Sequence, residues 1–280
     1  MKLSRREIAM AALLAGAALA GGEGEAAPVS VTERIEHGPR PSADPSYFTK
    51  VTGGEYIAMV LYPGMTALDL IGPHYFFSTM RGAKVHLVAP TMAPVACGQG
   101  VTLSPTATYA DVPKAVDILF VPGAGFPTLD ARKNDQLIDV LADRGERARY
   151  VTAVCTGPLL LGAAGLLKGY RATANWGIRD KVLPAVGAIP VDARYVVDRN
   201  RITGGGVTAG IDFGLHLAAL LRGPDNARVC QLLAEYDPAP PFDSGSPHKA
   251  WPESVSLVQS MIASFSDDLV KAGKARTNRA

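Results

Sequence analysis

The stretch YVTAVCTGPLLLGAAGLL, residues 150–167, joins an apolar run rich in β-branched residues to a small-residue helical segment through Cys-Thr-Gly-Pro. This order predicts a buried strand that ends at Cys155, followed by a tight turn and a helix that begins near Thr156. Because the unpaired N–H groups of a helix start favour an anion, we expect a lowered thiol pKa at Cys155. The arrangement is typical of a nucleophile elbow, with Gly157 keeping the turn clear; the alternative is a buried structural cysteine.

Apolar strands alternate with helical segments on both sides of this stretch. Strands are expected at 56–62, 84–90, 116–123, 150–155, 171–175 and, as a pair, 195–206, and helices at 68–80 with a turn near 72–73, 135–147, 156–167, 178–187 and 208–223. This alternation predicts an α/β fold with a mostly parallel sheet covered on both faces. Ligands of such sheets bind at the carboxyl ends of the strands, where the loops after Tyr62, Val121 and Val154 lie.

Three further segments place candidate residues at that edge of the sheet. FVPGAGF provides Gly123 and Ala124, whose backbone N–H groups we expect to face the Cys155 sulfur or a substrate anion. Pro127 and Thr128 stand where a dinucleotide-binding helix would continue, which argues against a dinucleotide fingerprint. YPGMTALDLIGP provides Asp69, either a helix cap or a general acid/base. ITGGGVTAGIDF lacks the Lys-Ser/Thr pair of a P-loop and predicts a tight turn that brings Val207 and Thr208 near the pocket.

The histidines show no ligand spacing, which argues against a metal site; they are His37, His74, His86, His216 and His248. Three cysteines are an odd number, so at least one is free or pairs between chains. Cys97 and Cys230 are expected either to form a bridge or to be two buried free thiols.

Residues 1–20 have the pattern of an export signal: a basic start, an apolar run from Ile8 to Ala20 and Ala18-Leu19-Ala20 before the expected cleavage point. Arg5 and Arg6 after a serine favour the twin-arginine route and a periplasmic location. This apolar run is too short for a permanent membrane span. Residues 1–20 hold three basic side chains and one acidic one, so their removal leaves 25 basic and 25 acidic side chains in the rest of the chain. A chain without net charge has no electrostatic basis for binding nucleic acid or an anionic membrane. Residues 21–54 are expected to be a linker or arm.

Together, YPGMTALDLIGP, FVPGAGF, AVCTGPLLLGAAGLL, ITGGGVTAGIDFGL and EYDPAPPFDSGSP resemble the DJ-1/PfpI superfamily, and within it the isocyanide hydratases, over residues 55–265. The resemblance implies a flavodoxin-like three-layer sandwich, a homodimer, and catalysis by Cys155 as nucleophile, Asp69 as general acid/base and Thr156 beside the thiolate. Residues 266–280 are then a polar tail. Two departures are the export signal and Asn175, which stands where relatives often carry His.

The resulting hypothesis is a hydratase without metal or cofactor that converts an isocyanide to an N-substituted formamide through a covalent thioimidate on Cys155. Gly123, Ala124, Gly157, Val207 and Thr208 are expected to line the substrate site. Two alternatives stay open: glyoxalase- or deglycase-like chemistry on 2-oxoaldehydes, and a binding or redox-sensing domain without catalysis.

Overall fold

The computed structural model describes residues 29–30 and 50–277. The expected export signal at 1–20 and most of the expected arm at 21–54 lie outside these residues. In the described part of the arm, strand β1 (Val29–Ser30) pairs antiparallel with residues 196–197 of the sheet.

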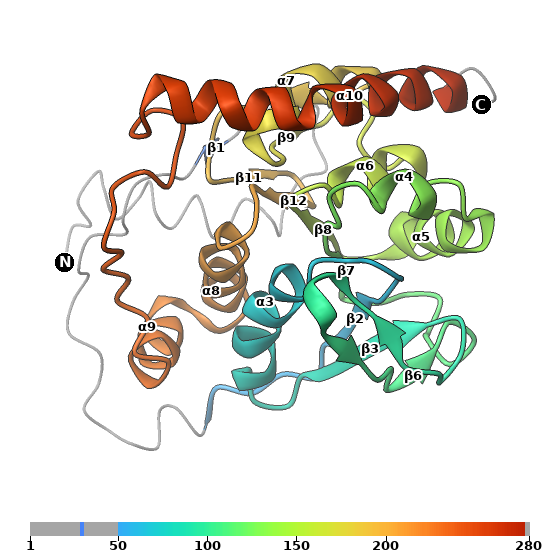
Figure 1. Cartoon of the computed structure of the whole chain (residues 1–280). Helices are drawn as coiled ribbons and strands as arrows, with labels where there is room; N and C mark the ends of the chain where they lie inside the picture. The colour runs from blue at the N-terminus through green and yellow to red at the C-terminus, as the bar shows by residue number, and fades with distance from the viewer. Residues whose placement is uncertain (1–28, 31–49, 278–280) are drawn as a thin grey trace.

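The central sheet has eight strands in the order β1-β11-β12-β8-β7-β2-β3-β6 (Figure 1). Its strands after β1 are β2 (Tyr56–Val60), β3 (Lys84–Ala89), β6 (Ala107–Thr108), β7 (Ile118–Val121), β8 (Tyr150–Val154), β11 (Tyr195–Asp198) and β12 (Arg201–Gly204). All neighbours from β12 to β6 are parallel, whereas β11 pairs antiparallel with β12 and β1. Two small sheets pair β4 (Val95–Ala96) with β5 (Thr102–Leu103) and β9 (Arg171–Ala172) with β10 (Ile189–Pro190).

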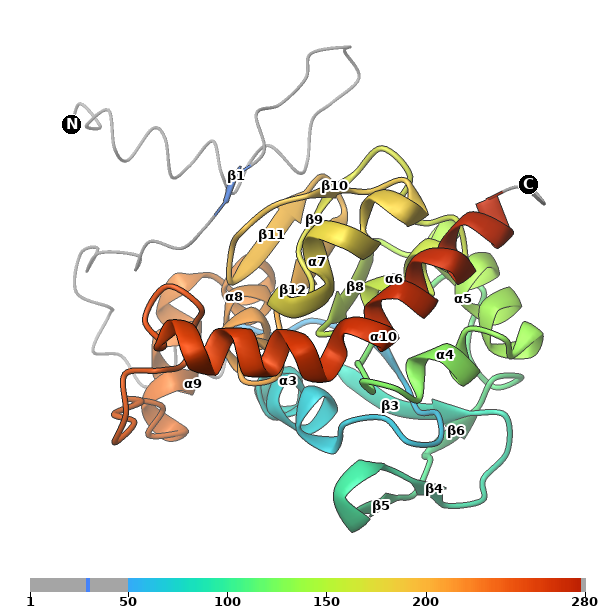
Figure 2. The same ribbon diagram turned by 45° about the horizontal axis from the view of Figure 1, so that its top comes forward.

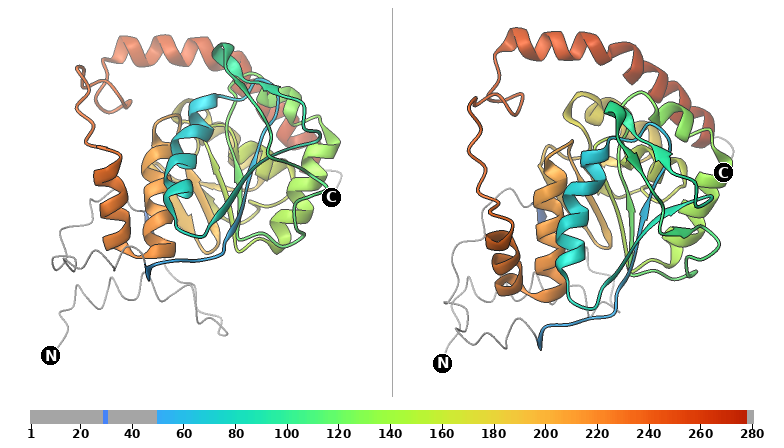
Figure 3. Two further views of the ribbon diagram at one scale, coloured as in Figure 1. Left: turned by 90° about the horizontal axis from the view of Figure 1, so that it is seen from below. Right: turned by 60° about the horizontal axis from the view of Figure 1, so that its bottom comes forward.

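Helices lie on both faces of the sheet, with α3 and α8 on one face and α5 on the other (Figure 3). The α-helices are α3 (Ala67–Thr79), α4 (Thr128–Ala131), α5 (Asp135–Arg147), α6 (Pro158–Ala163), α7 (Trp176–Val182), α8 (Ala209–Arg222), α9 (Pro224–Leu233) and α10 (Pro252–Thr277), and short 3₁₀ turns occur at Gly98–Gly100 and Pro184–Val186. The predicted α/β class with a mostly parallel, doubly covered sheet is confirmed. Burial on both faces explains why β2, β7 and β8 are almost wholly apolar.

Helix α3 runs without interruption through Pro73, so the expected turn near residues 72–73 is wrong. Proline removes one helical N–H, but close packing against α8 holds this segment helical. A methyl group on Gly214 would lie 2.8 Å from Cα of Pro73, and one on Gly72 would lie 3.0 Å from Cγ1 of Ile211. Glycines at these two positions therefore let α3 and α8 approach each other closely, which overrides the local preference for a turn.

Helix α10 crosses the domain boundary that the sequence places at residue 265, and it lies in front of α6 and α7 (Figure 2). Beyond that boundary, Ser266 and Leu269 are buried, and Leu269 and Phe265 form a second small core with Leu159, Ile178 and Val182. The expectation that 266–280 is only a polar tail is therefore wrong for these residues, because an apolar stripe of the helix is buried against α6 and α7. No helix within residues 29–30 and 50–277 combines the length and apolar character needed to cross a membrane.

Candidate active site

Cys155 lies between β8 and α6 in a left-handed backbone conformation, with φ at +59°. This conformation is unfavourable for a residue with a side chain and occurs mainly where the surrounding structure holds it in place. Here the Cys155 N–H donates to the carbonyl oxygens of Gly204 (3.1 Å) and Gly205 (3.0 Å), at the end of the neighbouring strand β12. The predicted strand–turn–helix elbow is confirmed, but the thiol is buried, with 5% of the residue exposed.

Gly157 allows the elbow to pack against the strand ends. A methyl group at this position would lie 2.4 Å from the carbonyl oxygen of Val121 and 2.9 Å from that of Val154. The Gly157 N–H donates to the Val154 carbonyl at 2.8 Å, which closes the turn. The structure thus gives Gly157 a packing role beneath the cysteine.

Asp69 lies in the first turn of α3, directly after the loop that follows β2, and is completely buried. Its Oδ2 accepts a hydrogen bond from the Gly123 N–H at 3.1 Å, whereas Oδ1 is buried without a well-formed hydrogen bond among the described residues. Burial raises the pKa of Asp69 to about 7, against the lowering effects of the Cys155 thiol and the Gly123 N–H. Asp69 therefore stands at the start of the helix, as one alternative expected, but it is not the cap residue, because Thr66 occupies the N-cap position of α3.

The thiol of Cys155 has a pKa well above its ordinary value, chiefly because it is buried and further because the Asp69 carboxylate lies beside it. The Thr156 N–H and the Asn175 side chain act in the opposite direction by donating to the sulfur. The expected lowering by the helix start is therefore wrong, since loss of solvation outweighs the few N–H groups of the six-residue helix α6. Near neutral pH the thiol holds its proton, and Asp69 is the neighbouring group that can accept it.

The Gly123–Ala124 loop has its N–H groups engaged within the protein. Gly123 donates to Asp69, and Ala124 donates to Oγ1 of Thr156 at 2.8 Å. Our expectation that these two N–H groups face the sulfur or a substrate anion is wrong, because each has a closer internal acceptor. The loop still borders the site, since a methyl group on Gly123 would lie 2.7 Å from Cβ of Cys155 and 2.6 Å from the Thr156 nitrogen.

Buried hydroxyl groups form hydrogen bonds around this loop. Oγ1 of Thr156 lies 2.7 Å from Oγ1 of Thr128, and the hydroxyl of Tyr62 donates to the Pro122 carbonyl at 2.7 Å. Burial raises the pKa of Tyr62, and the nearby Asp69 and Cys155 add to the effect. The Thr156 hydroxyl therefore anchors the loop, while its N–H contacts the sulfur.

Asn175 and Gly206 complete the surroundings of the thiol. A methyl group on Gly206 would lie 2.9 Å from Sγ of Cys155 and 2.9 Å from Nδ2 of Asn175, so both side chains border Gly206. Asn175 Oδ1 accepts from the Gly177 N–H at 3.0 Å, which orients Nδ2 toward the sulfur.

The sequence marked Asn175 only as a departure from relatives, and it did not single out Gly206, Tyr62 or Thr128. From the same glycine-rich turn as Gly206, Val207 is partly buried and Thr208 is exposed at the start of α8. Gly206, in the same turn, lies against the sulfur, and the expected proximity of Val207 and Thr208 to the pocket stays a prediction.

The remaining thiols and histidines lie elsewhere. Cys97 and Cys230 are buried free thiols, which decides against the bridge. Within the part of the chain that the structure describes, no three His, Cys, Asp or Glu side chains gather as a metal site would require.

The site belongs to the class of α/β proteins that present a cysteine on a strained strand-to-helix turn, at the carboxyl edge of a parallel sheet. Residues 55–220 match the DJ-1/PfpI family, and this chain is a member of that family. The resemblance found in the sequence motifs is thereby confirmed.

Three relatives illustrate the similarity. Isonitrile hydratase from Pseudomonas putida is 49% identical over 195 residues, which cover 69% of this chain and 84% of that protein. The crystal structure of a ThiJ/PfpI family protein from Pseudomonas syringae has a TM-score of 0.79 and 45% identity, and covers 85% of this chain and 98% of the other. A deglycase from Thermococcus kodakarensis is 30% identical over 141 residues, which cover 50% of this chain and 83% of that protein.

Proposed function

We propose that this protein is an enzyme that hydrates isocyanides, also called isonitriles, to N-substituted formamides, with Cys155 as the nucleophile and Asp69 as the group that moves protons. The observation that carries the proposal is the pairing of a buried thiol with a buried carboxyl group whose pKa lies at about 7. The 49% identity to an isonitrile hydratase supports this substrate class.

In the first step, Sγ of Cys155 attacks the terminal carbon of the isocyanide while Asp69 takes the thiol proton. Asp69 then gives this proton to the same carbon, and the product is a thioimidate in which sulfur, hydrogen and a C=N bond share one carbon. The Thr156 N–H and the Asn175 amide stabilise the negative charge on sulfur during the transfer.

In the second step, water attacks the thioimidate carbon, Asp69 accepts a proton from the water, and the nitrogen is protonated in turn. The tetrahedral adduct then collapses: the C–S bond breaks, a C=O bond forms, and the hydroxyl proton returns through Asp69 to the sulfur. A carboxyl group with a pKa near the working pH is suited to this exchange, because both of its protonation states are well populated.

The polar atoms around the thiol differ in whether they already have a hydrogen-bond partner. Oδ1 of Asp69 has no well-formed internal hydrogen bond, whereas the Gly123 and Ala124 N–H groups are occupied. Among the described residues, no donor outside the thiol competes with a water molecule or with the transferred proton for Oδ1 of Asp69. The family resemblance further supports a homodimer as the working form.

The proposal is tested by incubating the purified protein separately with an alkyl isocyanide and with methylglyoxal, and following the loss of each. We expect conversion of the isocyanide to formamide in wild type and in Cys97→Ala, which removes a buried thiol elsewhere, and none in Cys155→Ala. Faster loss of methylglyoxal would favour the deglycase-like alternative that the Thermococcus relative represents. Loss of neither compound would favour a binding domain.

A further inference from the structure

Helix α10 lies outside residues 55–220, which match the family, yet it contacts both loops that flank Cys155. On one side, the ring of Phe265 packs against Phe126, with 4.7 Å between ring centroids, three residues beyond Gly123. On the other side, Ile262 meets Gly177, two residues beyond Asn175. One helix from the end of the chain thus joins the two loops of the site.

At Gly177, the end of the Ile262 side chain occupies the space that a larger residue would need. A methyl group there would lie 2.1 Å from Cδ1 of Ile262, well inside van der Waals distance. Deeper in the same interface, Ile178 and Val182 of α7 pack against Phe265 and Leu269, all nearly inaccessible to solvent. The first turn of α7 is therefore packed directly against α10.

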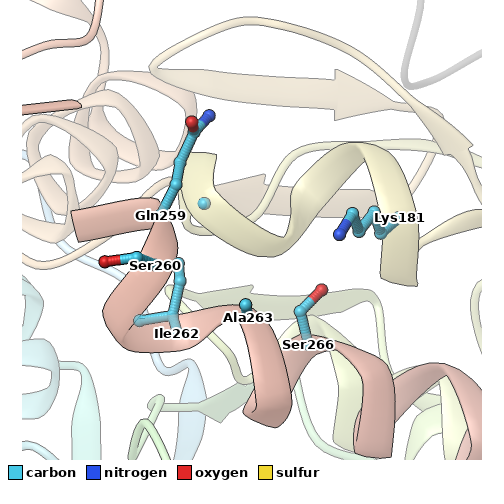
Figure 4. A pocket seen from close by; sticks show the side chains of 7 residues that line it. Lys181, Gln259, Ser260, Ile262, Ala263 and Ser266 are labelled. Carbon is cyan, nitrogen blue, oxygen red and sulfur yellow. The ribbon is translucent and has the colours of Figure 1, made fainter. Parts of the chain in front are cut away.

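Beside this contact, a cavity of about 400 Å³ separates the two helices. Figure 4 shows Gln259, Ile262, Ala263 and Ser266 of α10 along one side of it and Lys181 of α7 opposite. Because the interface is not filled here, the first turn of α7 has room to shift if the Gly177–Ile262 contact is altered.

The first turn of α7 holds the side chain that reaches the sulfur. Asn175 accepts from the Gly177 N–H through Oδ1, and its own N–H donates to the Cys155 carbonyl at 2.9 Å. Its Nδ2 and the Cys155 sulfur each lie 2.9 Å from the position that a methyl group on Gly206 would take, and the amide lowers the thiol pKa as a hydrogen-bond donor. A shift of Gly177 by a few tenths of an ångström moves this amide relative to the sulfur.

We propose that α10 acts as a clamp in which Ile262, pressed against Gly177, holds the Asn175 amide on the Cys155 sulfur, while Phe265 holds the opposite loop through Phe126. Ile262 and Phe265 are positioning residues, since neither contacts the thiol in the structure. This inference rests on the proposed role of Cys155 as the nucleophile, but it does not depend on which substrate the nucleophile attacks.

The test is a pair of substitutions that create and then relieve the clash. Gly177→Ala adds the methyl group, and Ile262→Val removes the Cδ1 atom that the methyl group meets. The readout is the rate at which iodoacetamide alkylates Cys155 as a function of pH, measured by peptide mass spectrometry, together with kcat and KM for an alkyl isocyanide. Circular dichroism confirms that each variant is folded, and Leu257→Ala, on an exposed face of α10, is the matched control.

We expect Gly177→Ala to alkylate about 10- to 100-fold more slowly at pH 7, the range expected when a hydrogen bond to a charged acceptor is lost. Its pH profile should move to higher pH, and kcat should fall more than KM rises. The double variant should return to within a few-fold of wild type. The other titratable groups that face the sulfur, Asp69 and Tyr62, are not substituted in any of these variants.

A folded Gly177→Ala with the alkylation profile of wild type would overturn the clamp, as would a double variant that stays as slow as the single one. Because alkylation needs no substrate, the outcome does not depend on isocyanide turnover. A protein that fails to hydrate isocyanides but shows the loss and rescue of alkylation would keep the clamp and remove the proposed function.

Discussion

The thiol-bearing Cys155 and the carboxyl-bearing Asp69 meet across the backbone of Gly123. A methyl group on Gly123 would lie 2.7 Å from Cβ of Cys155 and 2.8 Å from Oδ2 of Asp69. The two side chains come from the ends of β8 and the start of α3, almost ninety positions apart in the sequence. A residue without a side chain between them is what allows a direct transfer of a proton.

Gly123→Ala should therefore separate the pair. We expect kcat/KM for an alkyl isocyanide to fall by at least about 100-fold, the cost of misplacing a reacting group by about 1 Å. Overpacking should lower the free energy of unfolding by about 1–3 kcal/mol. Gly54→Ala is the control, because a methyl group there meets no atom within 4 Å. An active Gly123→Ala would show that the close approach of the two side chains is not needed.

Asp69→Asn keeps the size of the side chain but cannot exchange a proton. We expect a loss of about 10²- to 10⁴-fold in kcat/KM, the range for a general acid/base. In wild type, kcat/KM should rise with pH through about 7, because the ionised carboxylate accepts the thiol proton. That ascending limb should be absent from the pH profile of Asp69→Asn. A folded variant within a few-fold of wild type would mean that another group moves the proton.

The same carboxyl group should lower stability at neutral pH. In the unfolded chain it ionises near 3.8, and in the folded protein at about 7. Between these values the folded state binds more protons than the unfolded state, so the free energy of unfolding falls as pH rises across this window. The full difference between the two pKa values corresponds to a loss of at most roughly 4 kcal/mol in the free energy of unfolding.

Asp69→Asn should consequently gain stability relative to wild type between pH 4.5 and pH 8, as measured by urea unfolding at both pH values. If the free energies of unfolding of the two proteins differ by the same amount at both pH values, the raised pKa of Asp69 is contradicted. Both proteins carry all the other titratable groups, so the contributions of these groups cancel to first order when the two proteins are compared at the same pH.

Export is a separate prediction, since residues 1–20 lie outside the described part of the chain. Expressed in a bacterium with a twin-arginine pathway, the protein should be cleaved near Gly21 and recovered from the periplasm. Arg5→Lys with Arg6→Lys keeps the charge but alters the motif, and it should leave uncleaved precursor in the cytosol. Uncleaved wild type confined to the cytosol would remove the export proposal.

Much of the fold was predictable from local pattern. The β-branched run before Cys155 and the Thr-Gly-Pro turn after it are enough to predict the elbow, and the alternation of strands and helices predicts the sheet. The turn expected at Pro73 was not found, because Gly214 on α8, about 140 positions away, allows the close packing that keeps α3 helical.

The electrostatics of the site were not predictable in the same way. Proximity to a helix start suggests a low thiol pKa, but burial, which depends on the whole fold, reverses the direction. The partners of Gly123 and Ala124 depend on where Asp69 and Thr156 lie in space. Asn175 lies near the sulfur because it is the N-cap residue of α7, and the position of that helix depends on the whole fold.

The central claim is that Cys155 forms a covalent adduct with the isocyanide, and it is tested most directly by rapid acid quenching of the enzyme during turnover, followed by peptide mass spectrometry. We predict that the peptide containing Cys155 gains the full mass of one isocyanide molecule, and that this adduct appears before the formamide and is absent from Cys155→Ala. Formamide produced without any adduct on that peptide, together with turnover by Cys155→Ala, would contradict the account.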